Sequence, residues 1–340
     1  MPSRSIVRAS AFSVFVLGLV AGGLLLLADR WLETPLAVER AEVLLIEKGL
    51  PLANVANRLA ARGTLAHPRV FTWYARVTGA AHRIHAGEYT ITPGMTPRSL
   101  LDRLVRGDVV QHELRVLEGW TVAQLLDVIA TETSLVHEIT ADTDLRAALG
   151  VTESSIEGMF FPDTYQFIGG SSDLDLLGRA YERMKAELAS AWERRSADLP
   201  YRSPYEVLIM ASIVEKETGR RDERPKIAQV FVSRLKQGMP LQTDPTVIYG
   251  LGGAFDGNLT RRHLADDTEF NTYRRRGLPP TPIALPGRAS LEAAVHPAEG
   301  DYLYFVARGD GSSEFSATLA QHVAAVRRYQ LKRLDEPDNP

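Results

Sequence analysis

The sequence has 340 residues, of which 45% are hydrophobic and 24% charged, with a formal net charge of -3. This length and composition are typical of a globular chain with about two domains. The 39 basic and 42 acidic residues nearly balance, so the chain as a whole lacks the basic character that nucleic-acid binding requires. There is no cysteine, which excludes disulfides, thiolate catalysis and cysteine-bound metal. No nucleic-acid partner is expected.

The N-terminus carries an uncharged, apolar stretch at residues 9–28, long enough to cross a hydrocarbon core of ~30 Å as a helix. Arg4 and Arg8 precede it. Because basic residues favour the cytoplasmic side, residues 1–8 should stay in the cytoplasm while the chain after Asp29 is exported. A cleaved signal peptide is the alternative, but this run exceeds the usual ~7–15 residues and no small-residue cleavage site follows it. The sequence therefore predicts a single-pass anchor in the inner (cytoplasmic) membrane, with the remainder periplasmic.

Residues 38–108 are predicted to form a small α/β subdomain. Its expected elements, in chain order, are a strand at 41–47, helices at 51–63 and 68–78, a strand at 87–92 and a helix at 97–106. The order of strand, two helices and strand resembles a LysM-type carbohydrate-binding module. The alternative is a packing domain that only holds the rest of the chain off the membrane.

The remainder of the chain is predicted to be a larger α+β domain. Its expected elements are a strand at 109–117, helices at 122–131, 174–194, 204–218 and 225–236, and a strand at 302–306. The segment 156–167 is dense in aromatic residues, which we interpret as core side chains rather than a sugar-binding surface. Residues 334–340 are charged and contain proline, so a flexible tail is expected.

The helix at 204–218 carries a carboxyl group on an apolar face. At ~100° per residue, one arc of this helix is apolar. The arc contains Ile209, Met210, Ile213 and Val214. Glu217 falls inside this arc, whereas Glu215 lies about 200° away. A carboxyl group surrounded by apolar neighbours has a raised pKa and suits general acid catalysis.

Two other interpretations of this helix remain. Glu217 lies in the last turn, where many glutamates are simply solvated. Ser212 and Lys216 stand four residues apart and could form a serine–lysine nucleophile pair, although such polar pairs are common on exposed helix faces.

Short motifs in a fixed order run through the exported chain. They include ASIVEKET (211–218), LQTDPTVIY (241–249), NTY (271–273) and YLYFV (302–306), together with matches at 157–158, 161–165, 234–235, 277–280, 283–284, 286–287, 290–291 and 296–297. With these motifs the chain resembles the endolytic murein transglycosylase family, MltG or YceG-like. The resemblance covers essentially the whole exported chain and includes the membrane anchor.

The resemblance implies that Glu217, which is followed by the hydroxyl residue Thr218, is the catalytic residue, with Glu215 as its main rival. It also implies substrate-binding residues on two loops. These are Gln242, Asp244, Thr246, Tyr249, Asn271 and Tyr273. The chain departs from the expected pattern at Phe270, where a tyrosine would precede Asn-Thr-Tyr, so no hydroxyl role is carried over to that position.

The implied reaction cuts the β-1,4 bond between N-acetylmuramic acid (MurNAc) and N-acetylglucosamine (GlcNAc) within a glycan strand. Glu217 would protonate the leaving oxygen and then accept the proton of the muramyl 6-hydroxyl, which closes a 1,6-anhydro ring. Because this nucleophile is intramolecular, the second carboxylate of a hydrolytic glycosidase is not required. Asp244 is the candidate if a second carboxylate does take part, although an aspartate before proline in a turn is more often structural.

The predicted fold class is α+β, with a transmembrane helix at 9–28, a LysM-like subdomain at 38–108, a catalytic domain at 109–333 and a tail at 334–340. Peptidoglycan glycan strands are the expected partner, and peptidoglycan synthases are a second candidate. No cofactor is expected, and the scattered histidines do not indicate a metal site. The alternatives are a hydrolytic muramidase and a non-catalytic, peptidoglycan-binding scaffold of the elongation machinery.

Overall fold

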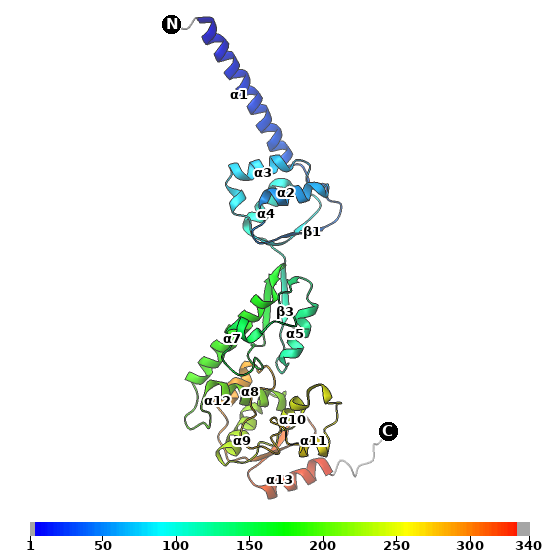
Figure 1. Ribbon diagram of the computed structural model, residues 1–340, viewed down its shortest axis with the longest axis vertical. Helices are drawn as coiled ribbons and strands as arrows, with labels where there is room; N and C mark the ends of the chain where they lie inside the picture. Colours follow the sequence, from blue (N-terminus) through cyan, green and yellow to red (C-terminus); the bar gives the residue numbers. More distant parts are fainter. Residues whose placement is uncertain (1–3, 332–340) are drawn as a thin grey trace. The chain divides into compact units, whose positions relative to one another are not determined.

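The computed structural model describes residues 4–331, with the backbone alone at residues 4–14, 17 and 331, so the predicted tail at 334–340 lies outside it. The fold is mixed α+β, as predicted, and consists of two compact units (Figure 1). Unit 1 comprises Met1–His112, Ser134–Val136 and Gln166–Ser171, and unit 2 comprises Glu113–Thr133, His137–Tyr165 and Ser172–Pro340. Their boundary falls within the paired strands β3 (Gln111–Arg115) and β5 (Thr164–Ile168).

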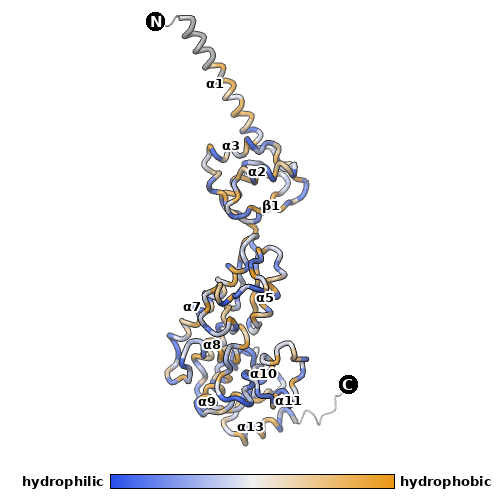
Figure 2. Tube along the Cα trace, viewed as in Figure 1, coloured by the Kyte–Doolittle hydropathy of each residue, from blue (hydrophilic) through white to orange (hydrophobic). Residues whose placement is uncertain are grey.

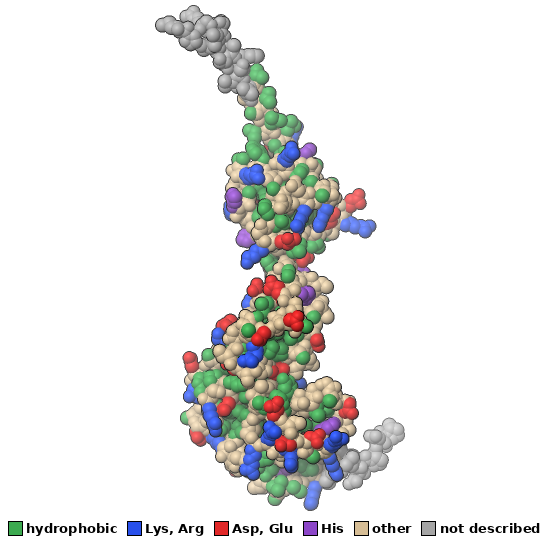
Figure 3. Space-filling view, in the orientation of Figure 1, with side chains coloured by type: hydrophobic (Ala, Val, Ile, Leu, Met, Phe, Trp, Pro, Cys, Tyr) green, Lys and Arg blue, Asp and Glu red, His purple; other side chains and the backbone are tan. Residues whose placement is uncertain are grey.

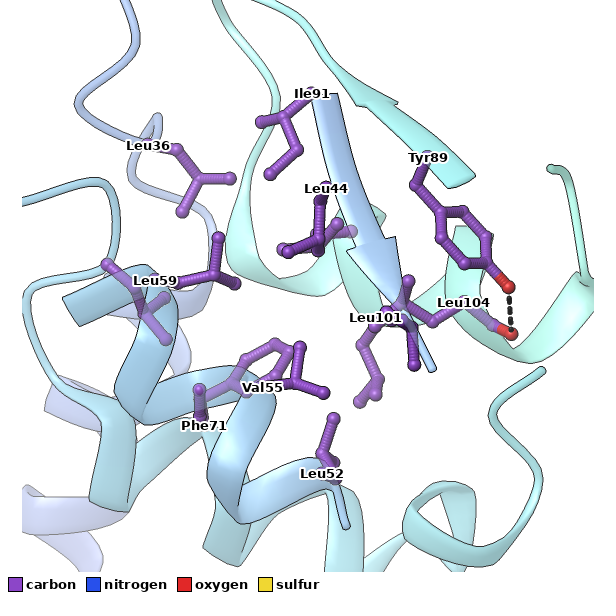
Figure 4. Close-up of a cluster of buried hydrophobic side chains, with 14 of the residues drawn as sticks. Leu36, Leu44, Leu52, Val55, Leu59, Phe71, Tyr89, Ile91, Leu101 and Leu104 are labelled. Carbon is purple, nitrogen blue, oxygen red and sulfur yellow. Dashed lines mark hydrogen bonds between the residues drawn. The ribbon is translucent and has the colours of Figure 1, made fainter. Parts of the chain in front are cut away.

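Unit 1 folds around one hydrophobic core. Its elements are β1 (Glu42–Ile46), α2 (Leu52–Ala61), α3 (Pro68–Val77), η1 (Ala80–His82), β2 (Gly87–Ile91) and α4 (Pro97–Arg106). The strands β1 and β2 are antiparallel. Buried side chains from the two strands and from α2, α3 and α4 form this core (Figure 4). At its edge the Tyr89 hydroxyl donates a hydrogen bond to the Leu104 carbonyl oxygen at 3.4 Å. The elements predicted from the sequence in this unit are confirmed to within about two residues, the usual uncertainty of helix ends.

Local chemistry explains why α4 begins and ends where it does. Thr96 and Ser99 form a capping box at the N-terminus, and Pro97 occupies the first helical turn, where its missing N–H is harmless. Gly107 ends the helix in the left-handed region, with φ of 68°. These signals lie within a few residues of the elements they bound, so they are readable from sequence.

Helix α1 (Arg4–Leu32) is the first element of this unit and contacts α4. Arg98 of α4 forms ion pairs with Asp29 and Glu33, each at 2.5 Å. The residues of α1 before Asp29 that are coloured in Figure 2 are mostly hydrophobic, and their described side chains are mostly exposed (Figure 3). Taken over the described residues, no helix has the length and apolarity needed to cross a membrane. The predicted segment at 9–28 lies partly outside the side chains that the structure describes.

Unit 2 is built around helix α8 (Pro204–Glu217), with α7, α9, α10 and α12 packed against it (Figure 1). The other elements are α5 (Val122–Thr131), α6 (Leu145–Leu149), α7 (Asp173–Glu193), α9 (Arg224–Lys236), α10 (Asp244–Leu251), η2 (Gly252–Ala254), α11 (Arg261–Ala265), α12 (Arg288–Val295), β7 (Tyr304–Ala307), β8 (Ser313–Ser316), α13 (Leu319–Val326) and η3 (Arg327–Leu331). The antiparallel pair β7–β8 is the remaining sheet of this unit, whereas β4 (Leu135–Val136), which pairs with β6 (Ser171–Ser172), belongs to unit 1. The four predicted helices of this region are confirmed.

The environment of α8 differs from the predicted amphipathic helix. Its residues 207–214 are all buried, so the helix has no solvent-facing side over that stretch. The prediction that one arc alone faces the core was therefore wrong, since a helix that is apolar on all sides is a buried helix. The aromatic segment agrees with its interpretation as core. Its members Phe160, Phe161, Tyr165 and Phe167 are all buried.

Candidate active site

Glu217 is the last residue of α8 and lines a pocket of about 490 Å³ in unit 2. The hydroxyl of Thr243 donates a short hydrogen bond to its Oε1 atom. Burial raises the pKa of the Glu217 carboxyl to about 7; the Thr243 hydrogen bond acts in the opposite direction, and the negative charge of Asp244 adds to the rise. A carboxyl with this pKa remains protonated in a large fraction of molecules at neutral pH, as a general acid requires.

The loop that carries Thr243 is fixed from behind by Thr272. The Thr243 N–H donates to Thr272 Oγ1 at 3.1 Å, and the N–H of Gln242 donates to the Thr272 carbonyl at 3.1 Å. Gln242 has a φ of 54°, an uncommon conformation for a residue with a side chain. Thr246 is fully buried, and its hydroxyl bonds to the Thr243 carbonyl and to Thr272. Thr246 therefore supports the loop, while Gln242 faces the pocket.

Asp244 and Tyr273 also line the pocket with Glu217. The Tyr273 hydroxyl donates to Asp244 Oδ1 at 2.5 Å, and burial raises the pKa of Tyr273, so this hydroxyl keeps its proton. Asp244, Thr246 and Tyr249 lie in helix α10, so the prediction that they lie on a loop was wrong. Asp244 is the first residue of this helix, where the helix N-terminus favours a negative charge. Asn271 is fully buried; its side chain binds three backbone carbonyls and the N–H of Tyr273. Asn271 thus holds the turn that presents Tyr273.

Tyr249 lines a different pocket, of about 740 Å³, together with Lys216 and Glu157. Its hydroxyl donates to Glu157 Oε2 at 3.1 Å, and its ring packs on that of Phe270 with centroids 5.0 Å apart. Glu157 is buried and also accepts the N–H of Val122; burial raises its pKa. The structure therefore brings Gln242, Asp244 and Tyr273 together with Glu217, and it places Tyr249 elsewhere.

The rival residues of α8 are engaged in the packing of unit 2. Glu215 forms an ion pair with Arg224 at 2.7 Å and accepts the N–H of Gly287 at 2.9 Å. The Ser212 hydroxyl donates to the Ile209 carbonyl and accepts a backbone N–H. Lys216 donates instead to the backbone carbonyl of Gly119. The serine–lysine pair considered above therefore does not form.

Among the residues that line the Glu217 pocket and were not predicted as site residues, three have ionisable side chains: Arg234 of α9, Tyr304 of β7 and His322 of α13. Arg234 and Tyr304 lie within motifs used for the resemblance, but nothing in the motifs indicated where their side chains point. His322 belongs to none of these motifs, so no sequence signal marked it. Within the described part of the chain, no group of three or more His, Asp or Glu side chains could hold a metal ion.

Comparison with known proteins places this site in a family. The chain matches the YceG-like family over residues 44–328 and therefore belongs to it. A Bacillus subtilis protein named endolytic murein transglycosylase is 31% identical over 303 residues, which are 84% of this chain and 83% of that protein. A Streptococcus pneumoniae protein of the same name is 26% identical over 77% of this chain, which spans about half (53%) of that relative. The crystal structure of a YceG-like protein from Listeria monocytogenes, 27% identical, superposes with a TM-score of 0.54 and covers 84% of this chain and 99% of the Listeria chain.

Proposed function

We propose that this chain is an endolytic murein transglycosylase that cleaves the β-1,4 bond between MurNAc and GlcNAc inside glycan strands and leaves 1,6-anhydroMurNAc ends. The observation that carries the proposal is the Glu217 carboxyl, whose pKa is raised to about 7 where it lines a pocket. Among the described lining residues, the other carboxyl belongs to Asp244, which accepts a hydrogen bond from Tyr273. A single available acid suits a reaction whose nucleophile is part of the substrate.

The proposed mechanism uses Glu217 twice. Its proton passes to the glycosidic oxygen as the bond to the muramyl C1 breaks, and positive charge develops on that sugar ring. The resulting carboxylate, stabilised by the Thr243 hydroxyl, then takes the proton of the muramyl 6-hydroxyl as its oxygen bonds to C1. The acid is regenerated, and no water is consumed. Family membership and the shared name of the curated relatives support this reaction.

Mass spectrometry of digested glycan strands tests the proposed reaction. Internal cuts that leave anhydro ends are expected. Reducing ends formed by the addition of water would instead identify a hydrolytic muramidase. An absence of cuts by the pure, folded chain would favour the peptidoglycan-binding scaffold.

The pH profile should report the protonation state of Glu217. Because the first step needs the acid form, kcat/KM should fall as the pH rises through about 7. Replacing Thr243 by valine removes a hydrogen bond that lowers this pKa, so the basic limb should move to higher pH. Replacing Asp244 by asparagine removes a charge that raises the pKa, so the limb should move to lower pH. Initial rates over about pH 5 to 9 measure both shifts, and movement of both variants in one direction would contradict the assignment.

We propose further that α1 anchors the chain in the inner membrane, with the N-terminus cytoplasmic. Its 29 residues span about 44 Å, more than a hydrocarbon core of about 30 Å, and its described side chains before Asp29 are mainly exposed and apolar. The full chain should stay with membranes after an alkaline carbonate wash, and a secreted form without residues 1–28 should be released. Recovery of the full chain in the soluble fraction would exclude the anchor. Such an anchor would place the cuts near nascent strands made by peptidoglycan synthases.

Unit 1 is proposed to be LysM-like. The support is topological: β1, α2, α3 and β2 follow one another, and β1 pairs with β2 in antiparallel fashion. Sedimentation with insoluble peptidoglycan, comparing the chain with and without residues 38–108, would distinguish a glycan-binding module from a spacer.

A further inference from the structure

Among the described residues, the buried cation Arg234 has no carboxylate partner. Its side chain is 7% exposed, and its Nε atom donates to the Leu303 carbonyl at 2.7 Å. Its Nη1 atom donates to the carbonyls of Leu241, at 2.8 Å, and Pro240, and to the side-chain oxygen of Gln242, both at 3.2 Å. All four acceptors are uncharged. They satisfy hydrogen bonds of the guanidinium but supply no opposite charge.

Arg224, on the same helix α9, is a buried arginine that is paired with carboxylates, as buried charges usually are. It is 4% exposed and forms ion pairs with Glu215 at 2.7 Å and Glu118 at 3.6 Å. The acidic groups that act on Arg234 are instead the phenols of Tyr304 and Tyr273, and burial lowers its pKa. A buried charge without a partner destabilises a fold, so its presence beside a pocket indicates that a ligand supplies the partner.

The free end of the guanidinium faces the pocket that contains Glu217. Arg234 lines that pocket, and among the described residues its Nη2 atom makes no hydrogen bond. The Tyr304 ring lies 5.2 Å from the Arg234 guanidinium carbon, and the His322 ring stacks on Tyr304 with centroids 5.1 Å apart. His322 lines the same pocket. Burial, followed by the charge of Arg234, lowers the pKa of His322, which is therefore a neutral imidazole at neutral pH with an N–H to donate.

The other charges of the pocket do not neutralise Arg234. Glu217 must be protonated when the substrate binds, and the Asp244 carboxylate is held by the Tyr273 hydroxyl. A guanidinium prefers a carboxylate as its partner, because two parallel N–H groups match two oxygens. The pocket therefore offers an unpaired guanidinium to a substrate that carries a carboxylate next to the scissile bond.

We propose that Arg234 and His322 form a subsite for a carboxylate of the glycan strand, and that this contact decides which of the two alternating sugars sits at Glu217. The inference rests on the proposed function. Muramic acid carries a carboxyl on its lactyl ether, which GlcNAc lacks. In strands with stem peptides this carboxyl is an amide, and carboxylates of the stem are the second possible source of the same chemistry. Binding at Arg234 would fix the register of the strand, so that the bond at the muramyl C1 is cut.

Substrate variants test the subsite without changing the protein. KM and kcat are measured for peptide-bearing strands, for peptide-free strands with free lactyl carboxyls, and for peptide-free strands whose carboxyls have been coupled to ethanolamine. Loss of a charged hydrogen bond should raise KM for the neutralised strands by about 10- to 100-fold, with kcat little changed. The lowest KM for peptide-free acidic strands identifies the lactyl carboxyl as the bound group, and the lowest KM for peptide-bearing strands identifies the stem.

Protein variants assign the effect to these two side chains. Arg234→Gln should remove the difference in KM between acidic and neutralised strands, Arg234→Lys should retain part of it, and His322→Gln should reduce it several-fold. Because Arg234 also holds backbone carbonyls, thermal unfolding is measured in parallel; His322, on the partly exposed helix α13, gives a second test if Arg234→Gln does not fold. Arg261→Gln, at an exposed position, is the matched control.

Equal KM for acidic and neutralised strands in the wild type would overturn the subsite and leave the proposed function intact. Failure to cut any strand would overturn the proposed function itself.

Discussion

Glu217→Gln is expected to lower kcat for strand cleavage by at least ~10²-fold and up to ~10⁴-fold, the range that general acid–base catalysis contributes. Glutamine has nearly the same shape but has no carboxyl proton to donate. Its amide can still accept the Thr243 hydrogen bond, so strand binding should change little. The rate of formation of anhydro ends, measured by mass spectrometry under saturating strand concentrations, gives the loss directly.

This variant should lose activity without losing stability. The folded-state pKa of Glu217, about 7, exceeds the ordinary value of 4.5, so the folded chain binds this proton more tightly than the unfolded chain. The ionised carboxyl therefore destabilises the fold progressively as the pH rises from about 4.5 to about 7, and its removal should not lower the melting temperature at neutral pH. Glu269→Gln, at an exposed position, is the control. Cleavage at the wild-type rate by Glu217→Gln would refute the proposed mechanism.

Glu215→Ala, in contrast to Glu217→Gln, is expected to lose stability. Its free energy of unfolding should fall by about 3–5 kcal/mol, as found when one partner of a buried ion pair is removed. The side chains of Glu215 and Arg224 are each 4% exposed, so the substitution leaves a buried guanidinium without its closest partner. It also leaves the N–H of Gly287 without its acceptor. Glu118 is too far away, at 3.6 Å, and too exposed, at 41%, to replace Glu215 fully.

Urea denaturation measures this loss, and a double variant supplies its control. Glu215→Leu combined with Arg224→Met removes both charges and should recover part of the stability, because the unpaired buried charge is gone. If Glu215→Ala kept its stability but lost kcat, Glu215 rather than Glu217 would be the catalytic carboxyl. The two substitutions together therefore distinguish the two glutamates of α8 by experiment.

The secondary structure was largely predictable because its signals are local. The capping box of Thr96 and Ser99 and the left-handed Gly107 lie at the ends of the helix they bound. Thr121 likewise caps α5 through a capping box with Gln124. Such contacts span three or four residues, so the chain forms them wherever the segment lies in the fold.

Helix α8 is more deeply buried than its apolar pattern predicts. The pattern predicts one buried face, but packing of α7, α9, α10 and α12 buries the helix on all sides between residues 207 and 214. Glu215 and Glu217 both lie in the last turn of this helix, after its buried stretch. Their different environments depend on partners elsewhere in the chain, such as Gly287, which lies 72 residues from Glu215.

The sequence alone determined the family resemblance, the helices and strands of residues 38–108, the four longest helices of unit 2 and the choice of Glu217 as the candidate acid, because motifs and helix caps consist of residues that are close together in the sequence. It did not predict the shorter helices α6 and α10–α13. The tertiary structure decided the rest. It placed Gln242, Asp244 and Tyr273 beside Glu217, left Thr246 and Asn271 as buried supports, and moved Tyr249 to a second pocket. It also brought Arg234 and His322 to the same pocket from α9 and α13. The raised pKa of Glu217 also depends on the tertiary structure, because its carboxyl is desolvated only when distant segments of the chain pack around it.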